Sequence, residues 1–231
     1  MESAAAIAGQ TTRPHLVVSV AEHKAVIDPA KWLKRRGFDV TFVDVDQYGM
    51  VQPEAVARAI RDSTVLVSVM LANNEVGTIN PVDAIGQECH QRDVLFHCDA
   101  TQGTACLPID FANWPVDLIS VSAHKAYGPK GVGALFVKRE VRRRIQPLFH
   151  GGGHEQSLRS GTLPVPLIVG FGAACQLADP EPSHVLKAMG RSDELAIASL
   201  RFGLGRGNSV EDVDFTIDYI SQIVGLLNES T

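Results

Sequence analysis

The sequence predicts an α/β protein in which a mostly parallel sheet is sandwiched by helices. Two observations support this prediction. Short apolar runs rich in β-branched residues alternate with longer amphipathic stretches along most of the 231-residue chain. The apolar runs are nearly continuous, which is typical of parallel strands with both faces buried. A chain of this length can bury one sizeable core, or form a large domain and a smaller one.

The apolar runs are the predicted strands, in chain order 15–20, 40–45, 65–71, 94–98, 118–121 and 134–137. The amphipathic stretches between the first four runs are predicted helices. The helix at 25–36 ends because Gly37 follows it. The helix at 53–61 has Pro in its first turn, where the missing N–H is harmless. A further helix is expected at 81–91.

The C-terminal part of the chain has a different pattern. An apolar helix is expected at 165–178, and two prolines directly after it end the pattern. Beyond them we expect a strand at 200–204 and a long final helix at 210–227. We therefore expect a large domain over 1–178 and a remnant of a smaller C-terminal domain over 179–231.

Charge and cysteine content exclude several classes of function. The chain has 21 basic and 26 acidic residues, a formal charge of −5, which disfavours partners such as nucleic acid or an anionic membrane. No apolar run approaches the roughly 18 residues that a membrane span needs. We assign no metal ligands. Without a CxxC pair or a dense framework, the cysteines are expected to be reduced thiols in the cytoplasm: Cys89, Cys98, Cys106 and Cys175.

Polar clusters follow several of the predicted strands. They are Glu22-His23, Ala72-Asn73-Asn74, Asp99-Ala100 and Ser122-Ala123-His124-Lys125. In open parallel sheets, ligand sites collect at the carboxyl ends of the strands. The sequence therefore predicts a ligand site at this edge of the sheet.

The segment around Lys125 suits an aldehyde cofactor. A lysine amine that is partly desolvated becomes a nucleophile at neutral pH and can hold an aldehyde as a Schiff base. Ser122 and His124 could donate hydrogen bonds to a phosphate on the same ligand. A surface lysine in a Gly-Pro turn is the competing interpretation, and the segment by itself leaves both open.

Asp99 falls at the end of an apolar strand, where a carboxylate needs a partner. A pyridinium nitrogen is suitable, because the ion pair keeps the ring protonated and able to accept electrons. The alternative is an Asp that caps the next helix.

The order of the motifs resembles the cysteine desulfurase family, which are fold-type-I, class V enzymes dependent on pyridoxal 5′-phosphate (PLP). The matching motifs cover most of the chain, at 22–24, 70–77, 99–102, 122–125, 151–162 and 199–205. The resemblance implies a PLP-dependent transferase-like large domain over 1–178, and a remnant of the family's small domain after it.

The resemblance also assigns roles to individual residues. Lys125 would hold PLP covalently, Asp99 would pair with the ring nitrogen, and His23 would stack on the ring. Gln102 would hydrogen-bond the ring's 3-oxygen, and Asn74 would contact the ring and the substrate. Ser122 and His124 would bind the phosphate. Thr162 would bind the phosphate on a neighbouring subunit, and Arg201 would clamp the substrate carboxylate. The role of Thr162 implies a homodimer, and a bidentate guanidinium suits the role of Arg201.

Two parts of the family pattern are missing. The chain opens inside a Gly-Ala-Thr-Glu-Ser motif and lacks its phosphate-binding Thr. It also joins the helix ending near Cys175 almost directly to Glu181, where the family has a loop with a persulfide-forming Cys. Cys175 has the spacing to Glu181 of the catalytic Cys, yet it follows a stretch that matches a structural helix. Thiols on apolar helices are usually buried and unreactive, so we expect a structural role for Cys175, with a catalytic one as the alternative.

The resemblance implies a cysteine desulfurase, which takes sulfur from L-cysteine to an enzyme persulfide and releases L-alanine. Its partners would include a sulfur acceptor or an iron–sulfur scaffold protein. We expect impaired activity because the catalytic loop is missing. Two alternatives stay open: a selenocysteine lyase or another class V lyase or aminotransferase, and a non-catalytic remnant that binds PLP or a partner.

Overall fold

The computed structural model describes residues 13–107, 109–177 and 189–190, and 209, 211, 214–215, 217–218 and 221. The chain divides into two units, Met1–Glu181 and Pro182–Thr231, and the fold below is that of the first. The strand expected at 200–204 lies outside the described residues, as does most of the helix expected at 210–227.

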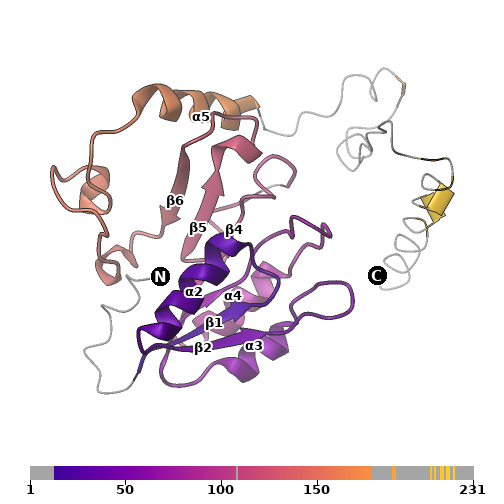
Figure 1. The fold of residues 1–231 in the computed structure, drawn as a ribbon, viewed down its shortest axis with the longest axis horizontal. Helices are drawn as coiled ribbons and strands as arrows, with labels where there is room; N and C mark the ends of the chain where they lie inside the picture. The colour runs from indigo at the N-terminus through magenta and orange to yellow at the C-terminus, as the bar shows by residue number, and fades with distance from the viewer. Residues whose placement is uncertain are drawn as a thin grey trace. The chain divides into compact units, whose positions relative to one another are not determined.

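The described residues form a six-stranded sheet in the order β2-β1-β3-β4-β5-β6. All neighbouring strands are parallel except β5 and β6, which are antiparallel. Figure 1 shows β2 and β6 at opposite edges of the sheet. The bounds are β1 His15–Ser19, β2 Asp39–Val43, β3 Thr64–Ser68, β4 Leu95–Asp99, β5 Leu118–Ser122 and β6 Gly133–Val137. The predicted strands and the mostly parallel sheet are confirmed.

Helices connect the parallel strands and cover the sheet. The α-helices are α2 Lys24–Arg35, α3 Pro53–Ala59, α4 Val82–His90 and α5 Val165–Leu177, with short 3-10 turns η1 Ala123–Lys125, η2 Arg142–Arg144 and η3 Glu155–Ser157. The predicted helix at 53–61 is shorter than expected, because Ile60 turns to an extended backbone with ψ 135°. None of the helices among the described residues is both long and apolar enough to cross a membrane.

Two clusters of buried side chains lie on the two faces of the sheet. Residues at alternating strand positions, such as Phe96 and Leu95, point into different clusters. One cluster includes Val56 of α3 and Ile85 of α4, and the other includes Leu33 of α2. Burial of each such side chain contributes about 1.5–3 kcal/mol to folding, so both helix layers hold the sheet in place.

His15 is a fully buried polar residue within this framework. Its Nδ1 and Nε2 lie 2.8 Å from the hydroxyls of Thr64 and Thr41. Burial, with a smaller contribution from Arg61, lowers the pKa of His15 to about 4. His15 is therefore a neutral ring that links β1 to the strands on both its sides.

Candidate functional site

The parallel register places the ends of β3, β4 and β5 side by side. Asp99 of β4 is the register partner of Ser120 in β5. On the other side, the Asp99 carbonyl accepts from the backbone N–H of Leu71 at 2.9 Å. The polar residues that follow these strands therefore collect at one edge of the sheet, as the sequence predicted.

The Lys125 segment is a short turn buttressed by α5. Ala123 and Ala126 are buried against Phe171 of α5. Gly128 donates its backbone N–H to the Ala123 carbonyl at 2.8 Å, and a Cβ at Gly128 would lie only 2.9 Å from that oxygen. This close turn fixes the backbone of Lys125 and leaves its side chain exposed. The surrounding residues therefore do not supply the partial desolvation that the sequence argument required for its amine.

Ser122 and His124 form a pair of donors beside Lys125. Ser122 Oγ lies 2.8 Å from His124 Nδ1. His124 is exposed and Ser122 is half-buried, so both can turn toward a ligand at the end of β5. Such a pair suits a phosphate, which accepts several hydrogen bonds.

Asp99 is 7% exposed at the end of β4. Its Oδ1 accepts from the backbone N–H of Thr101 at 3.0 Å, which caps a turn and not an α-helix. Its Oδ2 makes no hydrogen bond within the described part of the chain. The capping interpretation therefore explains one oxygen, and the other is free for a ligand.

A row of polar side chains lies two residues before Asp99 on the same face of the sheet. His97 Nδ1 lies 2.8 Å from Ser68 Oγ, and its Nε2 lies 3.1 Å from Ser120 Oγ. Burial lowers the pKa of His97 to about 4, although the charge of Asp99 acts in the opposite direction. Sequence reasoning missed this row, because the three residues stand on three separate strands.

Glu22 and His23 follow β1 and differ in exposure. His23 is exposed, and as the N-cap of α2 its Nδ1 accepts from the Ala25 N–H at 3.2 Å. Glu22 is 5% exposed, and its Oε1 accepts from the Met70 N–H at 2.5 Å. Burial, together with the charge of Asp99, raises the pKa of Glu22 to about 8. The sequence argument marked Glu22 in a polar cluster and assigned it no role.

Asn73 and Asn74 also divide their roles. Asn73 donates from Nδ2 to the Ala21 carbonyl at 2.9 Å, and its Oδ1 accepts from the N–H groups of Glu75 and Val76 at 2.8 and 3.0 Å. Asn73 therefore shapes the loop and ties it to the end of β1. Asn74 is exposed and free to contact a ligand.

The other predicted site residues are not gathered so closely. Gln102 is half-buried in the turn that follows Asp99. Thr162 is exposed in the loop between η3 and α5. Arg201 lies outside the described residues, so its predicted role stays a prediction.

The cysteines fall into two classes. Cys89 and Cys98 are buried; burial raises the pKa of Cys89 to about 12 and raises that of Cys98 as well. Cys106 and Cys175 are exposed. The burial on which the structural interpretation of Cys175 rested is not found, because α5 buries only Phe171 and Ala174 among its described residues. The choice between a structural and a catalytic role for Cys175 stays a prediction.

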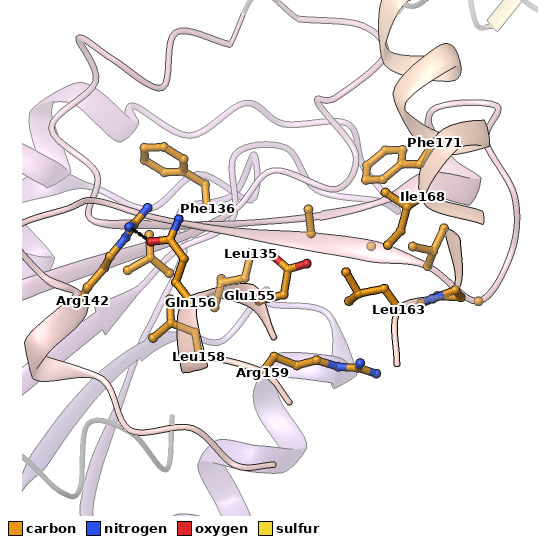
Figure 2. Close-up of a pocket in the computed structure, with 16 residues that line it drawn as sticks. Leu135, Phe136, Arg142, Glu155, Gln156, Leu158, Arg159, Leu163, Ile168 and Phe171 are labelled. Atoms are coloured by element: carbon orange, nitrogen blue, oxygen red, sulfur yellow. Dashed lines mark hydrogen bonds between the residues drawn. The ribbon is translucent and has the colours of Figure 1, made fainter. Parts of the chain in front are cut away.

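A hollow of about 600 Å³ lies beside β6 and not among these residues. Figure 2 shows Phe136 of β6 at one end of this hollow, near Arg142 and Gln156, which are hydrogen-bonded to each other, and Ile168 and Phe171 of α5 at the other end. None of the predicted cofactor-binding residues lines this hollow. No group of three or more His, Cys, Asp or Glu in the described ranges could hold a metal ion.

The edge of the sheet offers a donor set that fits PLP. An amine stands at Lys125, a carboxylate with a free oxygen at Asp99, and a hydroxyl–imidazole pair at Ser122 and His124. These groups suit an aldehyde, a pyridinium nitrogen and a phosphate in turn. The residues fit PLP in the chemistry of their side chains and in their shared location at one end of β4 and β5.

The chain as a whole is similar to proteins of a known family. The family described as "Aminotransferase class-V" matches residues 3–197. The cysteine desulfurase IscS of Edwardsiella ictaluri (strain 93-146) is 37% identical over 287 residues, which cover 93% of this chain and 71% of the relative. Because 287 exceeds the 231 residues of this chain, the relative has residues inside the matched span that have no counterpart here.

Solved structures give the same result. A NifS-like protein superposes with a TM-score of 0.73 and 30% identity, over 97% of this chain and 78% of that one. SspA in complex with cysteine superposes with a TM-score of 0.71 and 40% identity, over 77% of this chain and 51% of that one.

Proposed function

Because the chain belongs to the aminotransferase class-V family and, within it, to the cysteine desulfurases, we propose that it binds PLP and acts on L-cysteine. The observation that carries the proposal is the placement of Lys125 and Asp99 at the ends of adjacent strands β5 and β4. An amine and a nearly buried carboxylate at one sheet edge are what an aldehyde-bearing pyridine ring requires.

Each residue of the site has a task in this proposal. Lys125 would hold the aldehyde carbon, and Asp99 Oδ2 would accept a hydrogen bond from the ring nitrogen and keep it protonated. Ser122 and His124 would donate to the phosphate, and the exposed ring of His23 would stack on the pyridine. The cofactor supplies an electron sink for the carbon atoms of the substrate.

The rest of the site orients cofactor and substrate. Gln102 would donate to the ring's 3-oxygen, and Asn74 would contact the ring and the substrate from its loop. Arg201 pairs with the carboxylate of L-cysteine. In the reaction, the Cβ–S bond of cysteine breaks, the sulfur bonds to an enzyme thiolate, and a proton replaces it on Cβ to give L-alanine.

We place Thr162 in the phosphate site of a second copy, which makes the functional form a homodimer. Its exposure on the loop before α5 supports this role. A sulfur acceptor or an iron–sulfur scaffold protein would receive the persulfide. Four free thiols in the chain support a reducing compartment, the cytoplasm.

The chain by itself has little or no desulfurase turnover in this proposal. A thiolate must travel to the sulfur of the substrate, and misplacement by about 1 Å can lower the rate about a hundredfold. Cys175 is exposed but stands within the last turns of α5, which limits its travel. The additional residues of the IscS relative inside the matched span support the absence of a mobile loop here.

The test of the proposal is PLP binding by the purified chain. Added PLP should give a visible absorbance band, and borohydride should fix the cofactor to the peptide that contains Lys125. Lys125→Ala should lose both signals, whereas Lys130→Ala, at an exposed lysine of the same segment, should keep them. Fixation at another lysine would reject the assignment, and absence of a band would favour a remnant that does not bind PLP. Release of alanine and sulfide from L-cysteine then measures turnover.

A further inference from the structure

Glu22 is a buried acid whose hydrogen-bonding capacity its neighbours only partly satisfy. It is 5% exposed, and one of its oxygens, Oε1, accepts a single hydrogen bond from the Met70 N–H. The other, Oε2, is buried and has no hydrogen-bond partner among the described residues. A buried carboxylate with one hydrogen bond and no cation is strongly disfavoured, and a neutral acid is the form that such a site accepts.

The charges around Glu22 act in the same direction. The ionisable groups that face it from β4 are Asp99 and Cys98, both acids. Its neighbours in sequence, His23 and Lys24, are exposed at the start of α2. Within the described part of the chain, no cation is among the groups that act on Glu22, so an ionised Glu22 would add a second negative charge near Asp99.

We propose that Glu22 is a positioning residue for the cofactor site, a neutral acid in the cofactor-free protein that releases its proton to solvent when a cationic ring nitrogen pairs with Asp99. The inference rests on the proposed function. In this inference the binding of PLP is coupled to the loss of a proton from Glu22, and the coupling acts through the charge of Asp99. While Glu22 is neutral, Asp99 is the only anion of the pair, and its free oxygen is available to the ring.

The direction of the linkage follows from burial. Desolvation is the largest cause that keeps Glu22 protonated, and at 5% exposure the ring can add little to it. The cationic ring nitrogen, in contrast, would neutralise the charge of Asp99, and that charge is one of the causes of the raised pKa of Glu22. Loading therefore lowers the pKa of Glu22, and PLP affinity rises with pH where the proton is released.

The first experiment measures the dissociation constant of PLP between pH 6.5 and 9 for the wild type and Glu22→Gln. The amide keeps the size and the Met70 hydrogen bond but cannot ionise. Proton changes at Lys125 and at the ring are common to both proteins. The ratio of the two dissociation constants therefore isolates the contribution of Glu22. We expect the wild type to gain about threefold over Glu22→Gln across this range, equivalent to a fall of about half a pKa unit. A ratio that does not change with pH overturns the proposal.

Glu54→Gln is the matched control, because Glu54 is exposed in the first turn of α3, an element that carries none of the proposed cofactor-binding residues. It should follow the wild type at every pH. A pH-dependent ratio for Glu54→Gln equal to that of Glu22→Gln would also overturn the proposal, because the effect would then come from net charge.

The second experiment uses the wild-type protein alone, and its first part needs no cofactor. Infrared spectra of wild-type protein labelled with ¹³C at glutamate carboxyls should show a protonated acid at pH 6.5 that disappears by pH 9.5. Addition of PLP at pH 7.5 should weaken it. Absence of the band at pH 6.5 overturns the inference whatever PLP does. If PLP does not bind, the proposed function fails, and the band still decides whether Glu22 is the neutral acid.

Discussion

Nδ1 of His97 lies 2.8 Å from Oγ of Ser68, and this contact joins β4 to β3 directly beneath the candidate cofactor site. The opposite nitrogen, Nε2, reaches Ser120 Oγ on β5 at 3.1 Å. One neutral imidazole therefore holds three strands at a fixed separation, two residues before Asp99. Asp99 shares its strand and its face with His97, so the carboxylate stands on a part of β4 that this row ties to both neighbouring strands.

The pH dependence of stability should have a maximum near pH 6.5. The folded-state pKa of His15 and His97 is about 4, below the unfolded value of 6.5, so the unfolded chain binds more protons and stability falls as pH drops from 6.5 toward 4. Glu22 has a folded-state pKa of about 8 against 4.5 unfolded, so its contribution is lost as pH rises through that window. Adding the three effects gives a net loss of about 1 kcal/mol at pH 5 and at pH 8.

Urea unfolding of the cofactor-free chain at pH 5, 6.5 and 8 measures this profile. Glu22→Gln should remove the decline above pH 6.5, and His15→Gln with His97→Gln should reduce the decline below it. An identical profile in the wild type and in these variants would mean that other groups control the pH dependence.

Asp99→Asn should weaken PLP binding about tenfold, because a charge-assisted hydrogen bond to the ring nitrogen becomes a neutral one. The amide oxygen can still accept from the Thr101 N–H, so the free energy of unfolding should change by less than about 1 kcal/mol. Spectroscopic titration with PLP and urea unfolding separate the two effects. Asp83→Asn, at an exposed position in the first turn of α4, is the control. Unchanged affinity in Asp99→Asn would reduce Asp99 to a turn cap.

Asn73→Ala and Asn74→Ala should have opposite consequences. Asn73→Ala removes the hydrogen bonds to Ala21, Glu75 and Val76, and should lower the free energy of unfolding by about 1–3 kcal/mol. Asn74→Ala removes an exposed side chain, so stability should stay within about 0.5 kcal/mol while PLP or cysteine binding weakens. Thermal unfolding and PLP titration of the pair measure both properties. Equal stability losses in both variants would show that Asn74 is also structural.

Thiol labelling should separate the cysteines by burial. In the native protein, iodoacetamide should modify Cys106 and Cys175 and spare Cys89 and Cys98, whose burial raises their pKa. Mass spectrometry of the labelled peptides identifies the sites.

Turnover of L-cysteine should be low in the wild type and unchanged in Cys106→Ser. Rapid sulfide production that is lost only in Cys175→Ser would show that α5 delivers a working nucleophile, against our proposal.

The strands and helices of the large unit could be predicted from sequence because the signals are local. The apolar run before Asp99 and the Gly37 helix stop each lie within a few residues of the element they determine. The gathering of Asn74, Asp99 and Lys125 at one edge could also be predicted, since parallel strands bring their carboxyl ends together.

The sequence by itself determined the α/β class, the edge that carries the site and the motifs that mark the family. Only the tertiary structure decided the antiparallel direction of β6, the His97 row, the burial of Glu22 and the exposure of Cys175. The physical reason is distance along the chain. Register and burial depend on contacts between residues far apart in sequence, such as the 48-residue separation of Glu22 and Met70, and no local pattern encodes them.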